Sequence, residues 1–324
     1  MATPDVLVIG AGVSGLTTAI CLAEAGRAVT VAAAERPPRI TSAAAGAIWG
    51  PHLVEASERV ARWGGVTLAR LTDLAADPET GVHLAGGVAA SADGGSEPFD
   101  WIRAMQPLVP CDPADLPHGY AAGWRLTAPL VSMPVYLAYL LARLERAGAA
   151  FREAEFGSLG EAAELTGARV IVNCSGIGAS RLVPDPQVTP VRGQAVVVEN
   201  PGLTEFFVGG GEDPGDVRYY FPHGDSTVLG GSEEAGNWSL EPDPATAERI
   251  LSRCAEVQPR LQGARVTGHR VGLRPVRPSV RLEAESLDGR LLVHNYGHGG
   301  AGVTLSWGCA DEVTATVLRE AAVP

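Results

Sequence analysis

Three glycines near the N-terminus have the spacing of a nucleotide-binding turn. The stretch "VIGAGVSGL" places Gly10, Gly12 and Gly15 between a β-branched run and a helical pattern. In such a turn the first glycine permits the tight bend, the second lets the backbone approach a pyrophosphate, and the third lets helix and strand pack closely. The N–H groups that begin the helix face the anion. These glycines therefore predict dinucleotide binding.

The elements around this turn support the prediction. Hydrophobic patterning predicts a strand over 5–9, a helix over 13–25 and a second strand over 28–33. Glu35 follows the second strand, 20 residues after Gly15, where a carboxylate can accept hydrogen bonds from a ribose. Both NAD and FAD fit this unit.

A second glycine-rich turn distinguishes the two cofactors. Residues 291–308 read "LLVHNYGHGGAGVTLSWG", which predicts a short strand, a turn rich in glycine and a helix that runs to about Arg319. A reduced isoalloxazine carries negative charge that a second helix N-terminus stabilises, whereas a nicotinamide needs no such dipole. The turn therefore favours non-covalently bound FAD, and a purely structural glycine cap is the alternative.

Composition excludes several classes of protein. The chain has 324 residues, 46% of them hydrophobic and 19% charged, with a net charge of −12, which disfavours nucleic-acid partners and anionic membranes. Every basic residue is arginine, which excludes a lysine Schiff base or nucleophile. Five scattered cysteines predict free thiols and no metal site. We find no signal peptide and no long apolar run, so we expect a cytoplasmic protein.

The remaining elements predict an α/β (α+β) protein with two discontinuous domains. A helix over 132–147 and a strand over 169–174 return to the nucleotide-binding part, and 190–232 is rich in alternating, strand-like pieces. A helix over 244–257 and a strand near 266–273 follow. We therefore expect a Rossmann-like FAD-binding domain (1–55, 130–190 and 282–324) and a mainly antiparallel substrate-binding domain (56–129 and 191–281). Residues 50–125 give no clear pattern.

Three separated blocks carry a family resemblance. The first is "VLVIGAGVSGLTTAICL" with "AAAGAIWGPHL", and the second is "VIVNCSGIGASRLVPDPQVTPVRGQ". The third contains "RYYFPHGDSTVLGG", "VGLRPVRPSVRLE" and "VHNYGHGGAGVTLSWGCADEV". In this order, across nearly the whole chain, the sequence resembles the D-amino-acid oxidase family of flavoproteins, which includes D-aspartate oxidase.

The resemblance implies a reaction and the residues that perform it. A D-amino acid with a neutral or hydrophobic side chain would lose its α-hydrogen as hydride to flavin N5, and O2 would accept the electrons to give hydrogen peroxide. The imino acid would hydrolyse to a 2-oxo acid and ammonia. Arg274 would hold the substrate carboxylate in two hydrogen bonds, assisted by the hydroxyl of Tyr219, and the Gly300 carbonyl would accept from the amino group. Tyr220 should face the other side of its strand.

The same resemblance implies the cofactor contacts and the substrate pocket. His52 and Phe221 would line the pocket. Apart from the resemblance, a histidine in a glycine turn usually bonds backbone groups, so we expect His294 and His298 to hold the second glycine turn in this way. Residues matched to FAD contacts are Gly10, Ala11, Gly12, Val13, Ser14, Gly15, Glu35, Arg36, Thr41, Ser42, Ala45, Gly46, Ala47, Ile48, Phe156, Ser175, Gly176, Gly299, Gly302, Val303 and Thr304.

Several alternatives stay open. His52 or Arg218 would suit a second carboxylate, as in a D-aspartate oxidase, and a glycine or sarcosine oxidase is a further option. A non-catalytic or NAD-linked nucleotide-binding protein is the third. The loop "GGGEDPGDVRYYFP" is shorter than in animal members, so a lid should be absent or reduced, and the end "REAAVP" lacks a peroxisomal tripeptide. A homodimer is an option.

Overall fold

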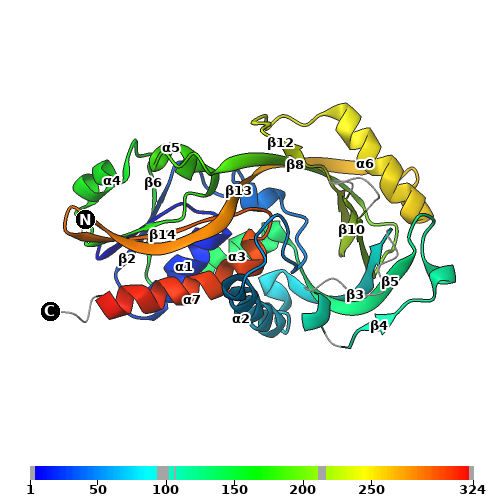
Figure 1. The fold of residues 1–324 in the computed structure, drawn as a ribbon, viewed down its shortest axis with the longest axis horizontal. Helices are drawn as coiled ribbons and strands as arrows, with labels where there is room; N and C mark the ends of the chain where they lie inside the picture. The colour runs from blue at the N-terminus through cyan, green and yellow to red at the C-terminus, as the bar shows by residue number, and fades with distance from the viewer. Residues whose placement is uncertain (1–3, 93–101, 106, 211–216, 321–324) are drawn as a thin grey trace.

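The computed structural model describes residues 4–92, 102–105, 107–210 and 217–320. The strands of this part are β1 (Val6–Ile9), β2 (Val29–Ala33), β3 (Val82–Ser91), β4 (Val109–Pro110), β5 (Ala122–Val131), β6 (Ala150–Glu153), β7 (Val170–Asn173), β8 (Thr189–Glu199), β9 (Phe206–Gly210), β10 (Val217–His223), β11 (Ser226–Gly230), β12 (Glu234–Ala235), β13 (Val266–Leu287) and β14 (Arg290–His298). They join in the order β4-β5-β3-β9-β10-β11-β8-β13-β14-β7-β1-β2-β6, with β12 beside β8. The mixed α/β fold with a mainly antiparallel part is confirmed (Figure 1).

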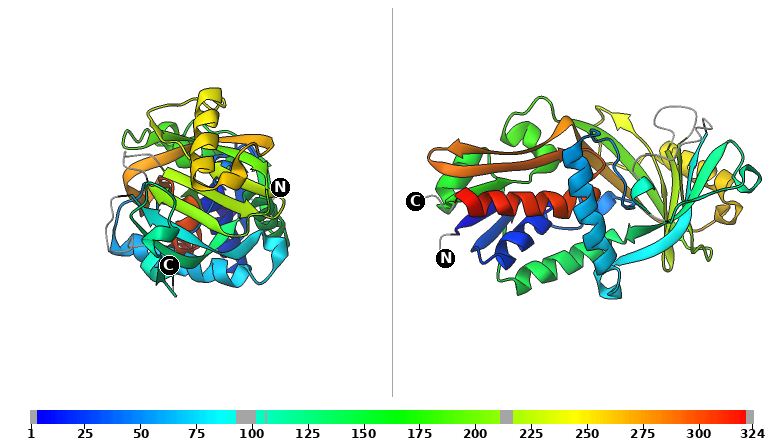
Figure 2. Two further views of the ribbon diagram at one scale, coloured as in Figure 1. Left: turned by 90° about the vertical axis from the view of Figure 1, so that its right-hand side faces the viewer. Right: turned by 60° about the horizontal axis from the view of Figure 1, so that its bottom comes forward.

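The helices cover this sheet on both sides. They are α1 (Val13–Glu24), α2 (Glu58–Leu74), α3 (Met133–Arg146), α4 (Leu159–Thr166), α5 (Ala179–Leu182), α6 (Pro244–Val257) and α7 (Gly302–Glu320), with short 3-10 turns at Thr41–Ala44, Pro78–Thr80, Ile102–Ala104, Pro113–Asp115, Gly176–Gly178 and Pro259–Leu261. Figures 1 and 2 show α1, α3 and α7 on one side of the parallel part and α4 on the other.

The parallel part buries both of its faces. In β1, Val6 and Val8 join the core shared with α1, α3 and α7, whereas Leu7 and Ile9 join the core beneath α4. Strands β2, β6, β7 and β14 run parallel in this region, so their apolar side chains alternate between two covered faces. The first glycine turn follows the carboxyl end of β1, and the second follows the carboxyl end of β14.

Strand β13 links the two parts of the sheet. It pairs with β8 over its first half and with β14 over its second, and its register shifts between Val276 and Arg281. The sequence indicated only 266–273 as strand, because Pro275 and Pro278 lack the N–H that a regular ladder needs. The two-domain division stays a prediction, and its boundary at 281/282 falls within β13.

The segment that the sequence left unassigned is ordered within its described residues. Helix α2 begins after Ser57, whose hydroxyl accepts from the Val60 N–H, and crosses α7. The Gly308 amide of α7 donates to Thr67 of α2 at 3.1 Å, a close approach that glycine permits. None of the described helices is long and apolar enough to cross a membrane.

Candidate active site

The first glycine turn is packed so closely that Gly10 and Gly15 leave no room for a side chain. Gly10 has φ +112°, and a Cβ there would lie 2.3 Å from the Cys174 carbonyl oxygen. A Cβ at Gly15 would lie 2.0 Å from the Gly10 oxygen. Gly12 is the N-cap of α1 and supplies no side-chain cap, which leaves N–H groups at this helix start open to an anion. Ala11, Val13 and Ser14 complete the predicted turn.

Two hydroxyls lie at this turn. Ser42, in the 3-10 turn Thr41–Ala44, accepts a hydrogen bond from the Val13 N–H at 3.0 Å, so the predicted pair Thr41 and Ser42 reaches the start of α1. On the other side, the Ser175 N–H donates to Asn173, and the buried Ser175 hydroxyl has no partner among the described residues. Gly176 follows with φ +57°.

The residues predicted to bind the adenosine half of FAD lie in separate segments of the chain. Glu35 is exposed just beyond β2, and the Arg36 guanidinium lies 4.0 Å above the ring of Phe151 in β6, a cation–π contact that the sequence did not predict. Phe156 packs against the core beneath α4.

The second glycine turn meets the first. A Cβ at Gly302, where α7 begins, would lie 3.8 Å from Val13 of α1, and the Thr17 hydroxyl of α1 donates to the Ser306 carbonyl of α7 at 3.2 Å. The two helix starts are therefore neighbours. Val303 is buried in the first turn of α7, and the Thr304 hydroxyl donates to the Gly50 carbonyl at 2.9 Å.

The second turn is pressed against the loop after residue 50. Gly299 has φ +54°, and a Cβ there would lie 1.8 Å from the Leu53 oxygen. The Gly300 N–H donates to the His52 carbonyl at 2.9 Å, and a Cβ on Gly300 would lie 2.5 Å from the His52 ring. Only glycine fits either position without displacing this loop.

The segment Ala45–Ile48 runs beneath the substrate-side aromatics. A Cβ at Gly46 would lie 3.0 Å from the Tyr219 ring and 3.1 Å from the Phe221 ring. The Gly46 carbonyl is 3.0 Å from His223 Nε2, and the Ala45 carbonyl accepts from Arg270 at 3.3 Å. The following residues join β5, since the Ala47 carbonyl accepts from Val131 and Ile48 forms a bridge with Leu130.

Strand alternation divides the aromatic residues of β10. Tyr220 enters the core under α6, as predicted, whereas Tyr219 and Phe221 stack on the other face with ring centroids 4.5 Å apart. Tyr219 lies against Gly230, where a Cβ would be 2.1 Å from the ring. Desolvation raises the pKa of Tyr219, with Arg274 acting in the opposite direction, so the phenol stays protonated.

Arg274 lies on the same face as Tyr219. It pairs with Val191 across β8, and its guanidinium lies over Gly193, where a Cβ would be 2.4 Å from Nη1. Nη1 donates to the Ser232 carbonyl at 3.0 Å. Within the described residues, Arg274 has no carboxylate within ion-pair distance. A planar cation that is positioned by a backbone carbonyl, and that forms no ion pair with another described residue, suits a carboxylate ligand.

The other arginines of "LRPVRP" and the strand after it are paired. Arg277 contacts Asp185 at 3.1 Å, and Arg281 contacts Glu283 at 2.6 Å and the Tyr296 hydroxyl at 2.7 Å. Arg218 faces away from Tyr219 and pairs with Glu256 at 3.2 Å, so its expected position near the side-chain pocket is wrong. His52 pairs with Glu233 at 2.9 Å.

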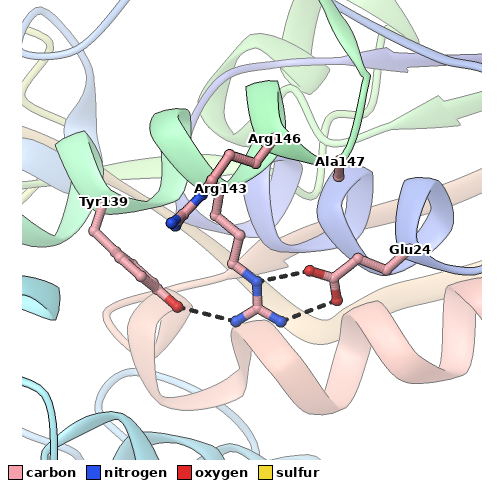
Figure 3. Close-up of a pocket in the computed structure, with 5 residues that line it drawn as sticks. All are labelled: Glu24, Tyr139, Arg143, Arg146 and Ala147. Carbon is pink, nitrogen blue, oxygen red and sulfur yellow. Dashed lines mark hydrogen bonds and ion pairs between the residues drawn. The ribbon is translucent and has the colours of Figure 1, made fainter.

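A pocket elsewhere on the surface serves as a contrast. Figure 3 shows Arg143 of α3 bound to both carboxylate oxygens of Glu24 of α1, at 2.8 and 2.9 Å, and to the Tyr139 hydroxyl at 3.1 Å. Arg146 and Ala147 complete its lining. None of these residues was predicted to bind a ligand, and the Arg143 guanidinium is occupied by protein groups.

Comparison with known proteins gives a family. Residues 5–316 match the DAO family, described as "FAD dependent oxidoreductase". The chain belongs to this family. The chain is similar to a D-amino-acid oxidase of Rubrobacter xylanophilus, with 52% identity over 313 residues that cover 95% of this chain and 94% of the relative. A D-amino-acid oxidase of Streptomyces coelicolor is 46% identical over 95% of both chains.

A solved structure supports the same fold. The glycine oxidase of Geobacillus kaustophilus superposes with a TM-score of 0.84 at 21% identity, and the match covers 98% of this chain and 95% of that chain.

The FAD of this family fits the residues present. The adjoining helix starts of α1 and α7 offer N–H groups to an anionic cofactor, and the unpartnered Ser175 hydroxyl lies beside the first of them. A buried hydroxyl without a partner is costly unless a ligand satisfies it. FAD is the cofactor of this oxidoreductase.

The two histidines of the second turn bond side chains instead of backbone groups, which corrects the predicted partners. His298 Nε2 lies 3.0 Å from the Asn295 side-chain oxygen, and burial lowers the pKa of His298 to about 4. His294 lies between Asn173 at 3.2 Å and Glu285 at 2.9 Å, and desolvation lowers its pKa too. These contacts hold β14 and the turn after it.

The sequence missed four residues that build the site. Gly193 and Ser232 support Arg274, His223 supports the Gly46 carbonyl, and Glu233 pairs with His52. Gly193 and His223 lie within quoted blocks but were given no role there, and the contacts of the four residues join positions from 42 to 181 residues apart. The prediction that a lid is absent or reduced concerns the loop before Tyr219, and it depends on residues 211–216, which lie outside the described part.

Proposed function

We propose that this chain oxidises D-amino acids with neutral or hydrophobic side chains to 2-oxo acids, ammonia and hydrogen peroxide, with FAD and O2. The observation that carries the proposal is the guanidinium of Arg274, which has no carboxylate partner among the described residues and shares a face with Tyr219. The relatives that are 52% and 46% identical are named D-amino-acid oxidases, which supports the same reaction.

Groups of the protein can bind both the carboxylate and the amino group of an α-amino acid. Arg274 binds the substrate carboxylate in two parallel hydrogen bonds, and the Tyr219 hydroxyl, kept protonated by its raised pKa, donates a third. The exposed Gly300 offers its carbonyl to the amino group, since its N–H already bonds His52. Together these contacts fix the hand of the substrate by geometry.

FAD supplies the redox chemistry when it is bound, because it accepts the α-hydrogen as hydride and passes the electron pair to O2. The protein orients the α-carbon, and the lone pair of the neutral amine forms the imine. No side chain is required as a general base. His298 is buried and bonded to Asn295, which supports a structural role for it.

Two further features belong to the proposal. A cytoplasmic location is supported by the five cysteines, which are all free. The oligomeric states to test are a monomer and a homodimer, and light scattering of the purified protein distinguishes these two states.

Anaerobic titration of the purified yellow protein tests the function. We expect D-methionine, D-valine and D-alanine to bleach the flavin absorbance, and their L-enantiomers to leave it unchanged. Bleaching by glycine or sarcosine in preference to these substrates indicates the glycine oxidase alternative. A colourless protein, or one that no D-amino acid reduces, contradicts the proposal.

A further inference from the structure

An ion pair lies between the proposed carboxylate and amine sites. Glu233 Oε1 is 2.9 Å from His52 Nε2, and the Glu233 side chain is only 17% exposed. The two residues come from segments far apart in sequence: His52 from the loop that packs on Gly300, and Glu233 from the segment that follows β11. The pair therefore bridges the second glycine turn and the antiparallel part.

Glu233 also lies near Arg274. The residue before it, Ser232, accepts the Arg274 hydrogen bond through its carbonyl at 3.0 Å. The hydrogen bond from His52, followed by the charges of His52 and Arg274, lowers the pKa of Glu233. Glu233 is therefore a carboxylate at neutral pH, beside the position where the substrate is held.

Charged side chains of both signs lie around the position of the substrate. The substrate carboxylate neutralises Arg274, and Arg270 on the same face donates to the Ala45 carbonyl. Arg218, a candidate partner for a second substrate carboxylate, lies on the opposite face with Glu256, and His52 is held by Glu233. Glu233 therefore places a carboxylate beside the bound substrate, with His52 as its ion-pair partner among the described residues.

We propose that Glu233, held by His52, is a charge filter for the substrate side chain, which disfavours a second carboxylate and favours a cationic group. The inference rests on the proposed function. It assigns a specificity-determining role to Glu233, which the sequence did not indicate as a site residue. Like charges a few ångströms apart in a partly buried site change binding by about 10- to 100-fold.

Substrates that differ in charge but little in shape test the filter. With the holoenzyme, kcat/KM is measured for D-aspartate against D-asparagine and for D-lysine against D-norleucine, in the wild type and in Glu233→Gln. We expect the aspartate-to-asparagine ratio to rise about 10- to 100-fold in Glu233→Gln and the lysine-to-norleucine ratio to fall. A merely structural role does not move the two ratios in opposite directions.

Glu256→Gln is the matched control, because it removes the same charge from an ion pair on the other face of the sheet. We expect both ratios to stay within about twofold of the wild type, since an exposed charge at that distance is screened. Unchanged ratios in Glu233→Gln, or ratios that move together, overturn the proposal.

A binding measurement needs neither turnover nor a variant that folds. Succinate and succinamate are titrated into the wild-type oxidised holoenzyme, and the shift of flavin absorbance gives each Kd. Succinamate should bind at least about tenfold more tightly, because only succinate brings a second carboxylate to Glu233. Equal affinity overturns the filter, whereas failure of every D-amino acid to reduce the flavin contradicts the proposed function instead.

Discussion

Two arginines on neighbouring strands show how the same side chain serves different ends. Arg192 of β8 is 1% exposed and bonds the Glu234 carboxylate, the Gln194 side chain and the carbonyls of Ser239 and Glu241. Arg274 of β13 lies on the opposite face and bonds one carbonyl. In a chain whose basic residues are all arginine, the number of protein partners, and not the residue type, separates a structural guanidinium from one that is available to substrate.

The largest effect is expected from removing the available guanidinium. Arg274→Ala should lower kcat/KM for a D-amino acid by about 10²- to 10³-fold, mainly through KM, because a charge-assisted contact to the carboxylate is lost. Its melting temperature should stay near that of the wild type, since Arg274 has few protein partners. Stopped-flow reduction and thermal unfolding measure the two effects. A near-native KM would remove Arg274 from substrate binding.

Removing the saturated guanidinium should affect stability instead. Arg192→Ala removes the cation that pairs with Glu234 and the donor to the carbonyls of Ser239 and Glu241, so we expect the free energy of unfolding to fall by roughly 3–5 kcal/mol. Urea denaturation followed by tryptophan fluorescence measures this change. A loss below about 1 kcal/mol would show that water replaces the guanidinium and that the partner count is a poor guide.

Acid sharpens the comparison, because guanidinium groups stay charged while a buried histidine titrates. The pKa of His298 is about 4 in the folded protein and about 6.5 when unfolded, so the unfolded state binds more protons between these values. The contribution of His298 to stability should therefore be complete above pH 6.5 and fall by on the order of 2–3 kcal/mol toward pH 4. The pH dependence of urea unfolding should flatten in His298→Gln, whereas the exposed His118→Gln should keep the wild-type slope.

The smallest effect is expected at the surface pocket of Figure 3. Arg143 pairs with Glu24, but the two side chains are 21% and 42% exposed, so solvent screens the interaction. Arg143→Ala should lower the free energy of unfolding by less than about 1 kcal/mol and leave kcat/KM unchanged. A loss as large as that of Arg192→Ala would mean that solvent exposure does not predict how much these ion pairs contribute to the free energy of unfolding.

The sequence predicted the features that depend on near neighbours. The turn from Gly10 to Gly15 follows from local backbone geometry, and the opposite orientations of Tyr219 and Tyr220 follow from strand alternation. Helix α2 was missed because Gly64 and Gly65 weaken a helical pattern, although Gly64 allows contact with Trp49. The pairing of Glu233 with His52 had no signal, since it arises only when distant segments meet.

The length of β13 has a mechanical consequence. A strand that is hydrogen-bonded to β8 at one end and to β14 at the other ties the arginine that would hold the substrate to the turn that would receive its amino group. A hinge motion between the parallel and antiparallel parts would break hydrogen bonds of β13. We therefore expect substrate and product to pass by local displacement of loops, with the distance between the two anchoring points held constant by β13.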